Sequence, residues 1–260
     1  MMKVVSSYPD GMFNWVDLST PDMEGAKAFY TNLFGWDARD RTTNQDTIYT
    51  MFSLEGQTVA GMSPAQSEES PAFWASYVKH SDVDAATQRA TEAGGEVIMP
   101  PMDVMSEGRM AFIKDAAGAA FGVWQPKNHI GAALVNTPGA LVWNELQTQN
   151  PTIASKFYED VFGWQTTADD TGYMMIQNGE RVQAAMIDMS TDHPDMPPHW
   201  AVYFMVADIK ASTDKVEQLG GKVLAPNIDA GEMGAFSMAQ DPQGGMFVIM
   251  EFKGEVDSPP

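Results

Sequence analysis

The chain repeats itself at a distance of about half its length. Residues 11–20 match residues 139–148, and Phe34-Gly35-Trp36 matches Phe162-Gly163-Trp164, both at an offset of 128 (from Trp15 to Trp143, 143 − 15 = 128). Farther along, the offset is 126, which relates Trp74 to Trp200, Asp82 to Asp208 and Gly118 to Gly244. An ordered series of matches with one change of offset predicts two homologous domains.

The repeat also places the domain boundaries. We expect a first domain over residues 1–128, a linker over 129–134, a second domain over 135–253 and a polar tail over 254–260. The joint between Pro126 and Pro138 contains Gly and Asn, which is typical of a connecting segment. A chain of 260 residues gives each domain an ordinary length.

Each domain shows the pattern strand, helix and three strands, twice. Residues 15–19 alternate like a strand, and Thr20-Pro21 is typical of an N-cap followed by the first residue of a helix. In the second domain, Asn150-Pro151 begins the equivalent helix. The predicted fold class is therefore α+β, with two tandem domains of two βαβββ units each and mainly antiparallel sheets.

Charge and cysteine content exclude several kinds of partner. The chain has 35 acidic and 15 basic residues, a net charge of −20, which repels nucleic acid and anionic membrane surfaces. It has no cysteine, so disulfides, thiolate nucleophiles and Cys-ligated metals are ruled out. No signal-peptide pattern or membrane-length apolar run is present. We therefore expect a cytoplasmic protein with no nucleic-acid or membrane partner.

The motif set resembles the vicinal-oxygen-chelate superfamily, which includes glyoxalase I, bleomycin-resistance proteins and extradiol dioxygenases. The residues that carry the resemblance are the strand around Trp15, then Phe29-Tyr30 and Phe34-Gly35-Trp36, Asp82-Val83-Asp84, Gly94-Gly95, and the turn and strand Asp115, Gly118 and Phe121. The second domain repeats nearly all of them. The resemblance implies that the sheet of each domain is U-shaped and holds a ligand on its concave face.

The resemblance also implies where a divalent metal is usually held, by His and Glu or Gln side chains in the cleft. The corresponding positions here are Trp15, Ala75 and Gly122 in the first domain and Trp143, Ala201 and Val248 in the second. Indole, methyl, isopropyl and hydrogen cannot coordinate such a cation. We therefore predict no family-type metal site and no cofactor.

Strand alternation predicts which side chains face the clefts instead. The predicted ligand-binding residues are Trp15, Asp17, Tyr77, Lys79 and Trp124 in the first domain, and Trp143, Glu145, Tyr203 and Met250 in the second. Aromatic walls with one carboxylate suit a flat or apolar small molecule. The alternative, that these rings fill redundant clefts as core, stays open.

Three classes of function remain open. The first is a small-molecule-binding protein of the glyoxalase/bleomycin-resistance type with a metal-free cleft. The second is an enzyme, such as a lyase, an isomerase or a hydroxylase or dioxygenase-like protein, with Glu145 and His199, or Asp17 and Lys79, as acid/base pairs. The third is an interaction module with closed clefts. A monomer and a homodimer are both compatible with two domains in one chain.

Overall fold

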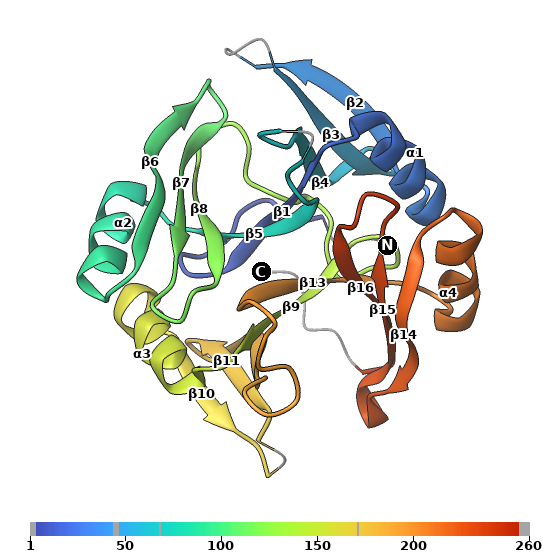
Figure 1. Ribbon diagram of the computed structural model, residues 1–260. Coiled ribbons are helices and arrows are strands. Elements are labelled where there is room, and N and C mark those ends of the chain that lie inside the picture. Colours follow the sequence, from blue (N-terminus) through green and yellow to red (C-terminus); the bar gives the residue numbers. More distant parts are fainter. Residues whose placement is uncertain (1–3, 44–46, 68, 171, 255–260) are drawn as a thin grey trace.

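The computed structural model describes residues 4–43, 47–67, 69–170 and 172–254, which form two eight-stranded sheets (Figure 1). The elements of the first half are β1 (Phe13–Thr20), α1 (Met23–Phe34), β2 (Asp37–Thr42), β3 (Ile48–Leu54), β4 (Gln57–Pro64), β5 (Phe73–Lys79), α2 (Val83–Glu92), β6 (Glu96–Val104), β7 (Gly108–Lys114) and β8 (Ala120–Pro126). The elements of the second half are β9 (Leu141–Thr148), α3 (Pro151–Phe162), β10 (Gln165–Ala168), β11 (Met174–Asn178), β12 (Arg181–Asp188), β13 (His199–Met205), α4 (Ile209–Gln218), β14 (Lys222–Asp229), the 3₁₀ turn η1 (Gly231–Met233), β15 (Gly234–Gln240) and β16 (Met246–Phe252).

Both sheets have the same topology. The strand order is β2-β3-β4-β1-β5-β8-β7-β6 in the first and β10-β11-β12-β9-β13-β16-β15-β14 in the second. The first strands of the two βαβββ units pair antiparallel at the centre, as β1 with β5 and β9 with β13. Among the strands of the described ranges, only the pairings of β1 with β4, β5 with β8 and their counterparts are parallel. The predicted α+β class and the twofold repeat are confirmed.

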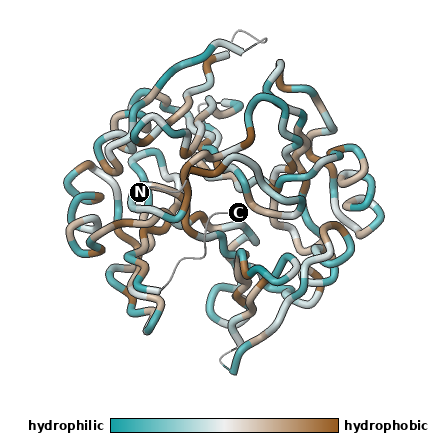
Figure 2. The backbone as a smooth tube through the Cα atoms, turned by 180° about the vertical axis from the view of Figure 1, so that it is seen from behind, coloured by the Kyte–Doolittle hydropathy of each residue, from teal (hydrophilic) through white to brown (hydrophobic). Residues whose placement is uncertain are grey.

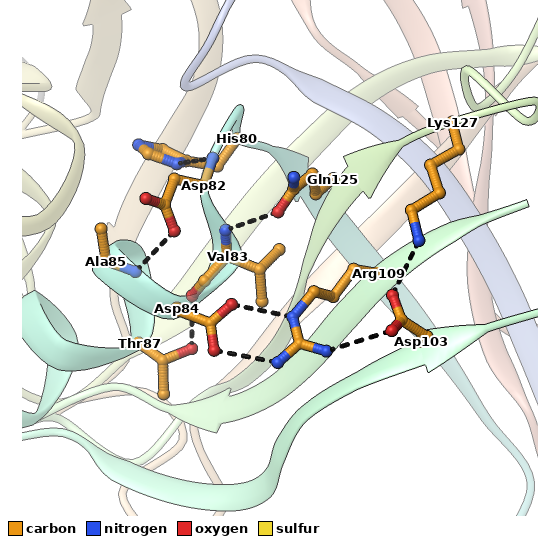
Figure 3. Close-up of polar contacts among 10 residues, drawn as sticks. All are labelled: His80, Asp82, Val83, Asp84, Ala85, Thr87, Asp103, Arg109, Gln125 and Lys127. Atoms are coloured by element: carbon orange, nitrogen blue, oxygen red, sulfur yellow. Dashed lines mark hydrogen bonds and ion pairs between the residues drawn. The ribbon is translucent and has the colours of Figure 1, made fainter.

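Of the two helix starts predicted from the sequence, the one at Asn150-Pro151 is confirmed. Asn150 precedes α3 with Pro151 as its first residue, and Asp82 and Asp208 cap α2 and α4. Figure 3 shows Asp82 accepting the Ala85 N–H. Helix α1 differs, since its N-cap is Asp22 and not Thr20. The Asp22 carboxylate accepts the Gly25 N–H at 2.9 Å, so a side-chain acceptor decided the boundary.

The hydrophobic cores do not follow the division into sequence halves. Helix α1 lies beside α4, and α2 lies beside α3 (Figure 1). One core joins Phe29 and Tyr30 of α1 to Phe204 and Phe247 of the second half. The other joins Phe121 of the first half to residues of α3. Apolar segments run through the middle of the molecule, and the outer hairpins are mostly hydrophilic (Figure 2). Each half therefore completes a core of the other.

Two buried hydrogen-bond relays fasten the halves together. In one, the Trp200 indole donates to the Tyr158 hydroxyl at 2.7 Å, and that hydroxyl donates to Asp115 at 2.9 Å. In the other, Trp74 donates to Tyr30, and Tyr30 donates to Asp241 at 2.8 Å. Burial raises the pKa of both carboxyl groups, while these hydrogen bonds oppose the rise.

None of the helices in the described ranges is long and apolar enough to cross a membrane.

The relays predict a stability effect of matched size at two distant positions. Tyr158→Phe leaves the buried Asp115 carboxylate without one of its donors, and should lower the free energy of unfolding by about 1–3 kcal/mol. Tyr30→Phe should cost a similar amount through Asp241. Urea denaturation at neutral pH measures both. Unchanged stability in either variant would show that its relay does not hold the halves together.

Candidate functional site

The concave face of the second sheet holds a cavity of 910 Å³. Its walls are mainly apolar, and the lining side chains are contributed by β9, β11, β12, β13, β15 and β16, with Tyr8, Met12 and Phe13 reaching in from the first half. Six methionines line it: Met12, Met175, Met189, Met233, Met238 and Met250. The size and the apolar walls are those of a small-molecule site.

One carboxylate is at the centre of the cavity's polar groups. Glu145 of β9 is buried and accepts three hydrogen bonds. The Tyr173 hydroxyl donates at 2.8 Å and the Tyr203 hydroxyl at 3.0 Å, while the Gln147 amide donates at 3.1 Å. Burial and the Glu145 charge both raise the pKa of the two tyrosines, so at neutral pH they are uncharged donors.

Trp143 brings a further polar group to this cluster. Its indole ring lines the cavity two residues before Glu145 on the same strand face. Its N–H lies near the Tyr173 hydroxyl. That buried N–H makes no hydrogen bond of good geometry within the described part of the chain. It is thus a donor that a ligand acceptor could satisfy after a small shift of the tyrosine.

The first sheet carries the same cluster at the equivalent place. The Trp15 indole donates to the Tyr49 hydroxyl at 3.0 Å, and Tyr49 donates to Asp17 at 3.0 Å. The Tyr77 hydroxyl approaches the two Asp17 oxygens at 3.2 and 3.3 Å. Trp15, Asp17 and Tyr77 are therefore brought together as the sequence predicted, with Tyr49 as an additional member.

Close packing distinguishes this first cluster from the second. A Cβ atom at Gly61 would lie 1.9 Å from the Tyr49 hydroxyl, and one at Gly122 would lie 2.0 Å from the Tyr77 ring. Both rings therefore lie directly on the backbone of their neighbouring strands. Trp124 covers Gly108 in the same way. In the first cleft, aromatic side chains occupy the concave face as packed core.

Two predicted residues have other partners than expected. Lys79 forms an ion pair with Asp10, so the Asp17–Lys79 acid/base pair is not formed. His199 pairs across β13 and β9 with Gln147, and its ring bonds to the Pro197 carbonyl at 2.9 Å. It lines a separate hollow of 430 Å³ between the two sheets, and no hydrogen bond to Glu145 occurs in the described structure. The two proposed catalytic groups thus do not meet directly.

The residues present do not fit the family's usual metal. Tyr77 packs against Gly122, where the resemblance places a ligand, so even a longer side chain there would clash. Trp15 and Trp143 fill two other ligand positions, and Val248 is buried beside Tyr203. Across the residues that the structure describes, no three His, Asp or Glu side chains are grouped so that they could hold an ion.

Tyr49 and Tyr173 were missed in the sequence analysis. They occupy equivalent positions at an offset of 124 (173 − 49 = 124), within the least similar part of the repeat. The signal is the shared Tyr-Xaa-Met pattern, Tyr49 with Met51 and Tyr173 with Met175. Extending the alignment through these strands would have found both tyrosines. The contribution of Tyr8 and Phe13 to the second cleft depends on tertiary packing alone.

The fold and its two clefts define a protein of the glyoxalase type. The chain superposes with a TM-score of 0.67 on the crystal structure of the Mn(II)-bound glyoxalase from Novosphingobium aromaticivorans, at 17% identity, covering 99% of this chain and 85% of that one. At such identity the likeness establishes the fold alone. The Glyoxalase/Bleomycin resistance protein/Dioxygenase superfamily pattern matches residues 12–123 and 140–249, and the chain belongs to this superfamily.

Two curated relatives match over nearly their whole length. A Mycobacterium tuberculosis protein named "Putative glyoxylase CFP32" is 40% identical over 254 residues, which cover 95% of this chain and 97% of that protein. The "Anthracycline biosynthesis protein DnrV" of Streptomyces peucetius is 34% identical over 268 residues, covering 96% of each.

The buried Asp17 predicts an unusual pH dependence of stability. Burial raises its pKa from 3.8 to about 6, against the opposing hydrogen bonds from Tyr49 and Tyr77. The folded state therefore binds this proton more tightly than the unfolded state, and stability is lost as the pH rises from 3.8 to about 6. Asp17→Asn should remove that loss, gaining about 3 kcal/mol relative to the wild type between pH 4 and pH 7.

Urea denaturation across this pH range measures the difference. Asp84→Asn is the matched control: hydrogen bonds with Arg109 lower the pKa of Asp84 from 3.8, so its effect on stability changes at lower pH, and this variant should run nearly parallel to the wild type between pH 4 and pH 7. A wild type and an Asp17→Asn variant whose stabilities run parallel with pH would show that Asp17 is not held protonated in the fold.

Proposed function

We propose that the protein binds a small, flat, aromatic or apolar molecule in the metal-free cleft of its second half. The observation that carries the proposal is the contrast between the clefts: one is packed with its own rings, and the other encloses 910 Å³ beside an intact Glu145–Tyr173–Tyr203 cluster. In the first half, the protein's own aromatic side chains fill the cleft as part of the core. The second half keeps the space.

The arrangement of polar and apolar groups supports such a ligand. Trp143, Phe236 and Phe252 offer ring faces and edges, and the methionines adapt to irregular outlines. The polar groups are gathered around Glu145, so they orient one end of the molecule. Because the acidic Glu145 side chain already accepts three hydrogen bonds, the pocket favours a neutral or cationic ligand over an anionic one.

The name of one relative supports this class of ligand. One is named for anthracycline biosynthesis, and anthracyclines are flat polycyclic aromatic compounds. We carry over the shape of such compounds and not a particular reaction. Trp143, Glu145, Tyr173, Tyr203 and Met250 are the residues that we assign to the ligand.

An enzymatic function is the second candidate, and it is favoured by the relative named a glyoxylase and by the proton-bearing cluster inside the cavity. Here Glu145 would move a proton of the substrate through Tyr173 or Tyr203, since His199 is not in contact with it. Turnover of any bound compound that Glu145→Gln abolishes, while binding persists, would select this candidate.

The binding proposal is tested with 1,4-dihydroxyanthraquinone, a neutral flat probe that quenches tryptophan emission. We expect saturable quenching with one site per chain. Ala230→Trp should place an indole against the cavity lining and weaken binding about tenfold or more, because each tenfold requires only about 1.4 kcal/mol. Ala38→Trp, on the exposed strand β2, is the matched control and should bind like the wild type.

Two results would overturn the proposal. One is the absence of saturable binding by the folded wild type. The other is equal affinity in the Ala230→Trp and Ala38→Trp variants, which would place the probe outside the cavity.

A further inference from the structure

The first cleft already contains a ring that belongs to no strand of its sheet. His129 follows β8 in the segment between the halves, and its imidazole lies edge-on against Trp15 with a centroid distance of 4.4 Å and an interplanar angle of 85°. The Trp124 ring lies 5.6 Å away on another side. The imidazole therefore contacts two indoles of the cleft, as a bound aromatic molecule would.

We infer that the first cleft is a second ring-binding site, whose occupant in this chain is the His129 side chain, and that without this side chain it takes a small neutral planar nitrogen heterocycle. The inference shares with the proposed function the premise that these clefts receive flat rings. It concerns the other cleft and residues that the proposed function does not use.

The backbone around His129 is held independently of the imidazole. Its N–H donates to the Glu107 carbonyl at 3.0 Å, and its carbonyl accepts the Trp124 indole N–H at 2.8 Å. Lys127, two residues earlier, pairs with Asp103 at 2.9 Å, and Asp103 also faces Arg109 (Figure 3). Removing the side chain at position 129 should therefore leave the segment in place and the space beneath it empty.

The chemistry of the occupant identifies the class of ligand. Within the described structure, the buried Nε2 atom of His129 has no hydrogen-bond partner. Burial, assisted by the charge of Arg41, lowers the pKa of the ring from 6.5 to about 4, so the imidazole is neutral at pH 7. The cleft holds this ring by shape and by contact with indole, and not by charge.

Comparison of equivalent residues in the two clefts supports the same inference. Trp143 and Met250 of the second cleft are the equivalents of Trp15 and Trp124 (143 − 15 = 128; 250 − 124 = 126). In the second half both residues line the open cavity. In the first half their counterparts contact the His129 ring. The two clefts thus have equivalent walls, and in the first cleft the His129 side chain of the chain itself occupies the space.

The test is chemical replacement of the missing ring. In His129→Gly, imidazole at about pH 8.5, where it is uncharged, should bind in the millimolar range expected of a five-atom ligand. Binding is followed by the indole N–H signals of Trp15 and Trp124 in ¹H–¹⁵N NMR spectra, assigned through Trp→Phe variants. We expect saturable shifts of both signals.

Two controls isolate the cavity. His129→Phe keeps a ring in the cleft and should show no shift of these signals, and Asn128→Gly adds the same backbone freedom while leaving the imidazole in place. His129→Ala replaces the glycine variant if that chain does not fold. A folded His129→Gly or His129→Ala whose Trp15 and Trp124 signals ignore imidazole would overturn the inference.

The outcome is separable from that of the proposed function. The second cleft is reported by the Trp143 indole signal, and the first by Trp15 and Trp124. Loss of probe binding at Trp143 would refute the proposed function and leave the imidazole result standing, and the converse also holds.

Discussion

The molecule depends on two buried hydrogen bonds that cross between its halves, from Tyr158 to Asp115 and from Tyr30 to Asp241. Each carboxylate belongs to the turn between the last two strands of one half, and each tyrosine to the first helix of the other. A buried carboxylate without donors is costly, so neither half can be moved away without exposing or stranding a charge. This constraint fixes both sheets and hence both clefts.

Although the two sheets are arranged alike, different side chains fill their clefts. Both keep a tryptophan, a carboxylate and two tyrosines, and in both the two tyrosine hydroxyls bond to the carboxylate. In the first cleft, Gly61 and Gly122 allow the rings of Tyr49 and Tyr77 to pack directly on the backbone. The His129 ring packs against Trp15. In the second, Ala185 and Val248 stand at the corresponding places, and the space remains open. Duplication thus supplied one packed cleft and one open cleft.

The architecture could be read from the sequence because it is encoded in repeated local signals. Asp82, Asp208 and Pro151 mark helix starts, and ordered matches at offsets of 128 and then 126 revealed the two halves. Alternation along β1 and β9 correctly brought Asp17 together with Tyr77, and Glu145 with Tyr203. The α1 boundary was wrong by two residues because two acceptors, Thr20 and Asp22, compete for one helix end.

The differences between the clefts could not be predicted in this way. That Lys79 turns to Asp10, or that His199 lies in another hollow, depends on contacts between distant segments. The position of His129 depends on a linker whose path no periodic pattern describes. Strand alternation states which face a side chain occupies, but not whether a neighbour from elsewhere fills the space in front of it.

The six thioethers around the open cavity give it a chemical vulnerability that its packed counterpart lacks. Conversion of such a sulfur to a sulfoxide replaces a soft apolar surface with a strong dipole. Peroxide exposure would therefore make the cavity walls more polar and weaken the binding of the hydrophobic ligand that we propose.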